Sequence, residues 1–564
     1  MSKYQDLSKE ELLKEVEKLQ QELKSKKYGL VWDSEKEPEK VVVDCENNLP
    51  ILERVKDKEV KTDESNDNIL IEGDNYHALT VLNYTHKSKI DVIYIDPPYN
   101  TGNKDFIYND RCVDKEDGYR HSKWLNFMEK RLRLAHHLLN EKGVIYISIG
   151  DDELAQLKIL CDQIFKEENL LAIISRKSKA TSNKGNFFSP STDYILAYAK
   201  NYLYLDTFDD AQAQTSEKYI KLFKNEDERG KFNMVSLYMP SLDPRPNQRY
   251  YITCPDGSKA ITPEEDKMFR WIPSTFEKNL KDDRVVFIKS KTSPLIDENG
   301  NQSKWNIYTK IYLHERQEGG MKPLTFLDMP NSAGSKELIK MGIDFSFSKP
   351  RPLIEHLIRI TNKGKDIYVL DFFAGSGTTG HAVLNLNQED GGNRKFIICT
   401  NNENDIAEKV TYNRISLAIK GYGTKKGEQV NGLGGNLQYF KTGLIDVERV
   451  DMVSDSQKQE LTYKAGQIIA IKENTFEEVE TNEWYQIFES KDKTRKTAIY
   501  FRENLDHFDS LIERIGKTKT VLYLYSYGRI KKETFQNIGK NIIIEDIPEP
   551  ILEIYKEINL TLEK

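Results

Sequence analysis

Two blocks in which short apolar strands alternate with helical segments constrain the fold of this chain most strongly. The first block includes "NILIEGD" (68–74), "DVIYID" (91–96) and "GVIYISIG" (143–150). The second includes "DIYVLDFFAGSGTTG" (366–380) and "RKFIICT" (394–400). Strands that are apolar along their length and are joined by helices are typical of a parallel sheet covered on both faces. The sequence therefore predicts an α/β fold.

The region between the two blocks lacks this alternation and is rich in aromatic, basic and proline residues. A chain of 564 residues is too long for one hydrophobic core and is expected to form several domains. We predict five segments: an N-terminal helix (1–30), the first half of an α/β core (31–165), an inserted domain (166–340), the second half of the core (341–440) and a small α/β C-terminal domain (441–564).

The N-terminal segment "LSKEELLKEVEKLQQELKSKK" (7–27) has leucine and valine at 4, 3, 4 spacing, as in the seam of a short coiled coil. An amphipathic helix that packs on its own chain has the same pattern over so few turns. Both interpretations remain open, and the first would make the protein an oligomer.

The overall charge and the cysteines exclude several classes of protein. Lys and Arg total 83 and Asp and Glu total 90, so the net charge is −7 and no global basic field attracts nucleic acid. The five cysteines form no C-x-x-C pair, which favours a reducing compartment over a disulfide or zinc framework. No apolar run approaches the ~18 residues of a membrane span. We expect a cytoplasmic protein without membrane contact.

The strand "DVIYID" runs directly into "PPYNTG" (97–102), which cannot continue it. Pro97 and Pro98 stiffen the loop and have no N–H to donate. Asp96 and the loop carbonyls are hydrogen-bond acceptors, and Tyr99 adds an aromatic face. Acceptors beside an aromatic ring suit a flat substrate that carries an amino group.

A second strand ends at the glycine turn "DFFAGSGTTG" (371–380). Gly375 and Gly377 allow a sharp turn and the close approach of a ligand. The turn lacks the third glycine of G-x-G-x-x-G and the lysine of a P-loop, which argues against binding of dinucleotide or ATP phosphates. A purely structural turn is the alternative. Because ligands of open parallel sheets bind at the carboxyl ends of strands, this turn and Asp96–Tyr99 are expected to share one crevice.

The motifs "EGDN" (72–75), "IDPPYNTG" (95–102), "FSFSKP" (345–350) and "DFFAGSGTT" (371–379) resemble those of S-adenosylmethionine-dependent amino-methyltransferases of DNA. Their order, with D-P-P-Y before F-A-G-S-G, resembles that of the circularly permuted β group. "TGNKDFIYND" (101–110) and "GGNLQYFKT" (434–442) are most similar to the modification subunit of type III restriction-modification systems. The resemblance implies a Rossmann-like methyltransferase sheet with an inserted target-recognition domain.

The resemblance also implies which residues bind the cofactor, S-adenosylmethionine. Asp74 would lie against its adenine, and Glu403 is the best candidate for its ribose. Lys349 would lie near its amino-acid end. The glycine turn would contribute the remaining contacts, from Asp371, Phe373, Gly375, Gly377, Thr378 and Thr379.

The catalytic loop implied by the resemblance is Asp96, Pro97, Pro98 and Tyr99. The exocyclic amine of a base is a poor nucleophile, and hydrogen bonds to Asp96 and to the Pro97 carbonyl would favour attack on the methyl group, without a metal or a covalent intermediate. The base must be flipped out of the duplex, and Tyr99 offers it a stacking face. Asp as the first letter of the motif usually accompanies adenine N6 in this family, so we expect adenine.

Contacts to DNA are expected in the inserted region. Between residues 171 and 186 lie four basic residues and no acidic one, namely Arg176, Lys177, Lys179 and Lys184. They could bind phosphates, or they could form a solvated surface. The segment "RPNQR" adds groups able to read base edges, from Arg245, Asn247, Gln248 and Arg249.

The expected partners are double-stranded DNA and a second copy of the chain. No P-loop or nuclease motif is found, so cleavage would belong to a separate helicase-nuclease restriction subunit. Two alternatives remain open. One is a methyltransferase acting on cytosine N4 or on RNA, and the other is a DNA-binding module without turnover.

Overall fold

A computed structural model describes residues 38–62, 67–102, 105–109, 111–179, 187–210, 217–240, 245–264, 267–319, 321–361, 364–527, 530, 535 and 538–562. The predicted N-terminal helix lies outside these residues. The chain forms two compact units, one of Met1–Asp206 with Leu324–Lys564 and one of Thr207–Pro323. No described helix is both long and apolar enough to cross a membrane.

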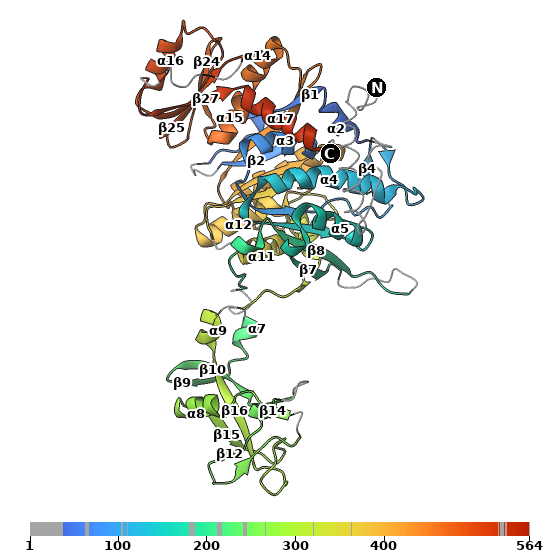
Figure 1. Cartoon of the computed structure of the whole chain (residues 1–564), viewed down its shortest axis with the longest axis vertical. Helices are drawn as coiled ribbons and strands as arrows, with labels where there is room; N and C mark the ends of the chain where they lie inside the picture. The colour runs from blue at the N-terminus through green and yellow to red at the C-terminus, as the bar shows by residue number, and fades with distance from the viewer. Residues whose placement is uncertain are drawn as a thin grey trace, which may run out of the picture. The chain divides into compact units, whose positions relative to one another are not determined.

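A ten-stranded sheet forms the centre of the first unit (Figure 1). Its six central strands β22, β2, β19, β18, β3 and β6 are parallel, and strands near both edges run antiparallel to them. In spatial order the strands are β1 (Asn48–Arg54), β22 (Asn436–Asp446), β2 (Asp67–Glu72), β19 (Lys395–Thr400), β18 (Tyr368–Asp371), β3 (Ile90–Ile95), β6 (Leu139–Ile149), β8 (Thr192–Ala199), β7 (Leu170–Lys177) and β17 (Phe326–Asp328). The predicted α/β, Rossmann-like fold is confirmed, as a mixed rather than a wholly parallel sheet.

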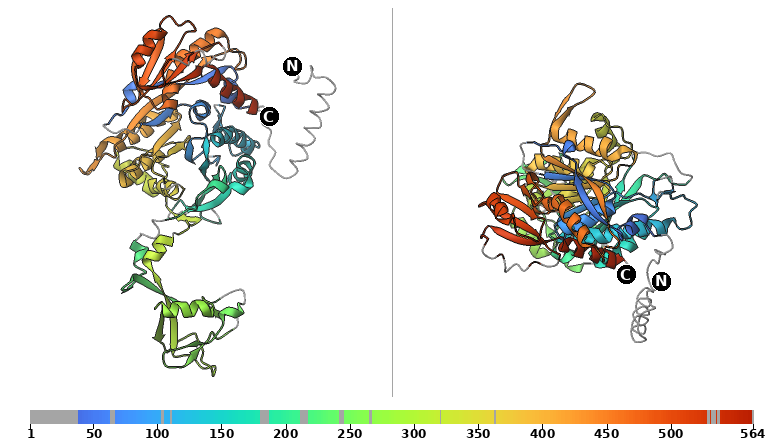
Figure 2. Two further views of the ribbon diagram at one scale, coloured as in Figure 1. Left: turned by 60° about the vertical axis from the view of Figure 1, so that its left-hand side comes forward. Right: turned by 90° about the horizontal axis from the view of Figure 1, so that it is seen from above.

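Two groups of helices cover the sheet. The first group consists of α3 (Asn75–Thr85), α4 (Arg120–Leu138) and α5 (Leu154–Phe165), and the second of α11 (Arg351–Thr361), α12 (Thr378–Asp390) and α13 (Asn413–Lys420). The path β2–α3–β3–α4–β6 crosses the sheet in one direction, and β18–α12–β19 crosses it in the other. Because such crossovers are right-handed, opposite directions put the two groups on opposite faces, as Figure 2 shows. The reversal between β18 and β3 creates a crevice at their carboxyl ends.

The apolar strands are buried as their composition predicts. β2 is buried from Asn68 to Glu72, and β3 is buried along almost its whole length. Their side chains belong to one hydrophobic cluster with α3, α4 and α5. Strands that are covered on both faces need no polar alternation, which explains their continuous apolar sequences.

The inserted compact unit is shorter than the predicted domain 166–340. β7 and β8 pair with each other and, through β8, with β6, so they extend the central sheet. β17 pairs with β7, and α10 (Ser332–Lys340) follows it in the first unit. The apolar halves of β7 and β8, "LLAII" and "YILAYA", suffice to extend the sheet at its edge.

The second unit is built around a four-stranded antiparallel sheet in the order β15 (Val285–Lys289), β16 (Trp305–Tyr312), β10 (Gly230–Ser236) and β9 (Asn225–Asp227). Its own core includes Phe269, Phe276 and Trp305. Smaller elements complete it: α7 (Glu217–Ile220), β11 (Tyr238–Pro240), β12 (Ile252–Thr253), β13 (Lys259–Ala260), β14 (Lys267–Phe269), α8 (Pro273–Lys281) and α9 (Leu313–Gly319).

The C-terminal region forms a five-stranded sheet of β23 (Glu477–Thr481), β24 (Tyr485–Glu489), β25 (Arg495–Tyr500), β26 (Lys519–Tyr525) and β27 (Ile542–Ile547). It is an α/β structure with α14 (Asp455–Lys464), α15 (Gly466–Glu473), α16 (Phe508–Ile515) and α17 (Glu549–Leu562). It is not a separate compact unit, because α15 and α17 pack on α3 and share its hydrophobic cluster. The Tyr555 hydroxyl donates to the Pro50 carbonyl at 2.7 Å.

Candidate active site

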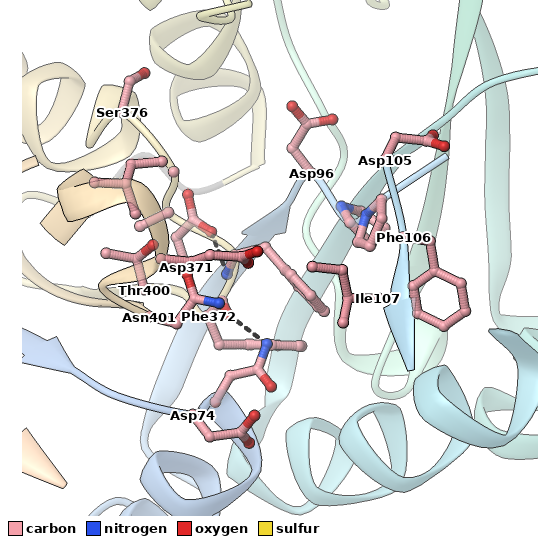
Figure 3. Close-up of a pocket in the computed structure, with 18 of the residues that line it drawn as sticks. Asp74, Asp96, Asp105, Phe106, Ile107, Asp371, Phe372, Ser376, Thr400 and Asn401 are labelled. Atoms are coloured by element: carbon pink, nitrogen blue, oxygen red, sulfur yellow. Dashed lines mark hydrogen bonds between the residues drawn. The ribbon is translucent and has the colours of Figure 1, made fainter. Parts of the chain in front are cut away.

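A cavity of about 980 Å³ lies at the carboxyl ends of the central strands and contains both predicted loops. Asp96 follows β3, Asp371 ends β18, and Asp74 follows β2. β3 and β18 are adjacent and parallel, with Val92 paired to Val369. Figure 3 shows the three carboxylates arranged around the cavity. Segments about 275 residues apart in sequence therefore meet in one crevice.

Asp96 is held by a lysine from the "SKP" segment. Lys349 Nζ donates to both carboxylate oxygens of Asp96 at 2.5 Å. Lys349 is only 8% exposed and its Nζ lies 5.1 Å from the centre of the Tyr99 ring. The pairing compensates the burial of a charged amine and fixes the orientation of the carboxylate.

The rest of the D-P-P-Y loop is fixed by neighbouring elements. The indole Nε1 of Trp124 donates to the Pro98 carbonyl at 2.8 Å. The Tyr99 hydroxyl donates to Asp193 at 3.4 Å, and its ring packs against Gly150, where a Cβ would lie 2.9 Å from Cδ2. Within the described part of the chain no donor bonds to the Pro97 carbonyl, whose residue lines the cavity.

Asn100 fixes the end of the loop through its buried side chain. Its φ of 55° lies in the left-handed region, and its buried side chain donates to Glu153 at 2.5 Å and to the Arg120 carbonyl at 3.2 Å. Burial raises the pKa of Glu153 to about 8, and the hydrogen bond from Asn100 opposes that rise in part. The sequence analysis did not identify this pair.

The glycine turn has the geometry that the sequence predicted. Gly375 and Gly377 have φ of 49° and 74°, and Gly377 precedes the first turn of α12. A Cβ on Gly377 would lie 3.2 Å from Thr411, whereas one on Gly375 would meet nothing closer than the Phe373 carbonyl at 3.9 Å. Gly375 therefore faces open space in the cavity, while Gly377 is needed for the turn itself.

A buried arginine that the sequence analysis missed holds this turn. Arg414 donates to Thr378 Oγ1 at 2.7 Å, Ser348 Oγ at 3.1 Å and Ser376 Oγ at 3.2 Å, and to Glu337 at 2.7 Å. It is completely buried in α13. Its position four residues before the buried Ala418 was the one available signal, since both share a helix face.

Asp371 is buried at the end of β18. It accepts hydrogen bonds from Thr379 Oγ1 at 2.5 Å and from the Phe373 N–H at 3.0 Å. Burial raises its pKa to about 7, the two hydrogen bonds oppose the rise, and the negative charge of Asp96 adds to it. The carboxyl group is thus poised between its charged and neutral forms near neutral pH.

Asp74 caps α3, where it accepts from the Tyr76 N–H at 2.7 Å. The buried Arg131 of α4 lies 3.4 Å from Asp74 and donates to both oxygens of Glu39 at 2.7 and 2.9 Å. Glu39 precedes α2 (Lys40–Asp44) and also lines the cavity. Sequence reasoning did not include Glu39 or Arg131, because their pairing joins residues 92 positions apart.

Most predicted site residues line this one cavity. Those that line it are Asp74, Asp96, Pro97, Pro98, Lys349, Asp371, Phe373, Gly375, Thr378, Thr379 and Glu403. Tyr99 and Gly377 do not belong to its lining. Glu403 is exposed and lies in the short helix η5 (Glu403–Asp405), beyond the end of β19.

The predicted DNA-contact residues are spread over both units. In the first unit, Arg176 is buried and donates to Asp193, so its guanidinium is engaged internally, contrary to the expected phosphate contact. Lys177 lies 3.5 Å from Asp328, Lys179 is exposed, and Lys184 lies outside the described residues.

Two further predicted DNA contacts are in the second unit. Arg245 is exposed. Arg249 is half-buried and donates to the Thr262 carbonyl at 3.2 Å.

Comparison with protein-family models identifies the class. The DNA methylase model N6_N4_Mtase matches residues 90–411, more than half of the chain and the part that carries both loops. The chain belongs to this DNA methylase family, as its resemblance implied.

Two curated relatives and one solved structure give a finer comparison. The type III restriction-modification enzyme StyLTI Mod subunit of Salmonella typhimurium is 31% identical over 69% of this chain and 60% of its own length. The type II methyltransferase M.KpnI of Klebsiella pneumoniae is 30% identical over 61% of this chain and 84% of its own length. The match to the solved PvuII DNA methyltransferase (cytosine-N4-specific) covers 62% of this chain and 86% of that structure's chain. The identity is 12% and the TM-score is 0.33. The chain spans less than two thirds of the StyLTI and phage P1 EcoPI Mod subunits, at 60% and 66%.

Proposed function

We propose that this chain transfers a methyl group from S-adenosylmethionine to N6 of a flipped-out adenine in DNA, as the modification subunit of a type III restriction-modification system. The observation that carries the proposal is the single cavity lined by Asp96 and by the glycine turn. The Mod subunits among the curated relatives support the type III assignment.

The cavity fits the cofactor that the family implies. The open space at Gly375 would allow a ligand to approach the backbone, and the exposed Glu403 could accept hydrogen bonds from ribose hydroxyls. Asp74, already oriented by the Tyr76 N–H, would accept from the adenine amine. When bound, S-adenosylmethionine supplies an electrophilic methyl group on a sulfonium.

The D-P-P-Y loop would activate the amine of the target base. Asp96 and the Pro97 carbonyl are acceptors that can bind its two N–H groups and favour a nitrogen whose lone pair points at the methyl group. Lys349 would keep the Asp96 carboxylate oriented, and the rigid loop would hold both acceptors without reorganisation. Tyr99, the last residue of this loop, packs against Gly150. Its ring could provide a stacking face at the edge of the site.

The remaining parts of the proposal concern partners. We assign DNA contacts to the predicted residues other than Arg176, because their guanidinium and amine groups can bind phosphates or base edges. They are Lys177, Lys179, Lys184, Arg245 and Arg249. A homodimer, a separate helicase-nuclease restriction subunit and a location in the cytoplasm complete the proposal.

A product analysis tests the proposed function. The protein is incubated with methyl-labelled S-adenosylmethionine and, separately, with mixed-sequence duplex DNA and RNA, and the products are digested to nucleosides and identified by mass spectrometry. N6-methyladenine in DNA is the expected result. N4-methylcytosine, label in RNA alone, or cofactor binding without transfer would each contradict it.

A further inference from the structure

Two adjacent phenylalanines are exposed in the connection between β7 and β8. Phe187 and Phe188 are 93% and 90% exposed, more than any other large hydrophobic side chain of the described residues. The proposed chemistry does not use them. Two consecutive aromatic side chains with this exposure are unfavourable in water and indicate a surface that is covered by a partner.

The connection that carries them leads into β8, whose Asp193 contacts Tyr99 of the D-P-P-Y loop. The N–H groups of Ser178 and Lys179 donate to the Ser191 carbonyl at 2.8 and 3.2 Å and close its base. Two residues after Ser191, the Asp193 carboxylate accepts hydrogen bonds from Arg176 and from the Tyr99 hydroxyl. In Figure 1 the described ends of this connection continue beyond β7 and β8.

The distance from this base to the rings is short. Phe188 is three residues from Ser191, and three residues span at most about 11 Å. The pair therefore lies within the range of a duplex whose target base has reached the D-P-P-Y loop.

The chemistry around the pair identifies the kind of partner. The exposed Lys179 and Lys177, whose Nζ lies 3.5 Å from Asp328, precede the pair. An anionic surface is therefore favoured next to an apolar one. A DNA duplex offers this combination, with phosphates outside and a base stack inside that accepts apolar wedges.

We propose that Phe187 and Phe188 enter the base stack at the target site and fill the gap left by the flipped adenine. The inference rests on the proposed function and adds to it the residues that stabilise the flipped state. Extruding a base costs a few kcal/mol in lost stacking and pairing, and an aromatic ring in the gap replaces part of the stacking. The wedge is thus a specificity-determining element for duplex substrate.

The test compares Phe187→Ala/Phe188→Ala with the wild type on two duplexes, one with a paired target adenine and one with an abasic site opposite it. The variant should lose about tenfold or more in kcat/KM on the paired duplex, as expected for a lost base–aromatic stack. On the abasic duplex, where extrusion costs less, it should act within about threefold of the wild type. Fluorescence of 2-aminopurine at the target should rise on binding of the wild type and much less with the variant.

Two controls make the result specific. Leu203→Ala, at a 72% exposed leucine in the helix η3 (Tyr202–Tyr204), should behave as the wild type on both duplexes. Phe187→Trp/Phe188→Trp, which keeps aromatic rings, should retain the fluorescence change. Equal losses on both duplexes, unchanged activity of the alanine variant, or a changed assembly state by light scattering would overturn the wedge. A wild type that transfers no methyl group would instead refute the proposed function, while the fluorescence still reports on the wedge.

Discussion

At the scale of single residues, the pair of Asp96 and Lys349 links structure to chemistry. The amine neutralises a carboxylate that, in the proposed reaction, also accepts a hydrogen bond from the substrate, and both oxygens of Asp96 are held at 2.5 Å. The sequence predicts that the two residues belong to one site, with Asp96 in the catalytic loop and Lys349 near the amino-acid end of the cofactor. It could not predict their direct pairing, because side-chain contacts across 253 positions leave no local signal.

Replacing Asp96 tests this role. Asp96→Ala should lower kcat by about a hundredfold or more, by analogy with the loss of one preorganised hydrogen-bonding group. Cofactor affinity, measured by titration calorimetry, should change little because the proposed partner of Asp96 is the amine of the base. The melting temperature should fall, since Lys349 loses its counter-ion in a buried position. Wild-type turnover by the variant would exclude Asp96 from catalysis.

Asp371 gives a prediction for pH dependence. Its pKa rises from 3.8 to about 7 on folding, so the folded state binds the proton more tightly than the unfolded state. Its contribution to stability is therefore complete below about pH 4 and is lost as the pH rises towards 7 and above. Asp371→Asn removes this dependence and keeps a hydrogen-bonding side chain. The melting temperature of the variant relative to wild type should increase from pH 5 to pH 8, and a difference that stays constant would contradict the shift.

At the scale of elements, one guanidinium joins three segments around the cavity. Arg131 of α4 binds Glu39 before α2 and lies beside Asp74 at the start of α3. The strands and helices of the core were predictable because their apolar patterns are long and regular. The sequence places the antiparallel pair β7 and β8 in the inserted domain, which is wrong, because charged residues end β7 and no helix joins it to β8.

Glu39 tests whether this junction matters for the cofactor. Glu39→Ala leaves the Arg131 guanidinium buried with weaker partners and should raise the Kd for sinefungin, an analogue of the cofactor, about tenfold, from the ~1–3 kcal/mol cost of an unsatisfied buried group. Glu46→Ala, at an exposed position just beyond the same helix, is the matched control and should have no effect. Equal affinities for all three proteins, measured by calorimetry, would remove Glu39 from the binding site.

At the scale of the whole molecule, the first compact unit, with its ten-stranded sheet, is interrupted in sequence by the second unit. The insert begins and ends at one point, because the Asp210 N–H donates to the Met321 carbonyl at 2.7 Å. Its existence was predictable from the loss of alternation, and its limits were not, because composition does not reveal which strands join a neighbouring sheet. The C-terminal α/β sheet was likewise predictable as structure, although its shared core with α3 was not.

Removing the insert separates cofactor binding from DNA recognition. A variant in which a short Gly-Ser linker replaces residues 211–320 should bind sinefungin within about threefold of the wild type, because the cavity belongs wholly to the first unit. It should lose methylation of duplex DNA. A cooperative melting transition provides the control for folding, and retained site-specific methylation would contradict the assignment of recognition to the insert.

The central claim is that the glycine turn and the D-P-P-Y loop bind donor and target in one crevice. A crystal structure with sinefungin and a duplex carrying the mapped target site tests it most directly. We predict an extruded adenine whose N6 donates to Asp96 and to the Pro97 carbonyl, with the analogue against residues 371–379 and its amine within about 3.5 Å of N6. An analogue bound elsewhere, or a target base that remains stacked or lies out of reach of Asp96, would contradict the account.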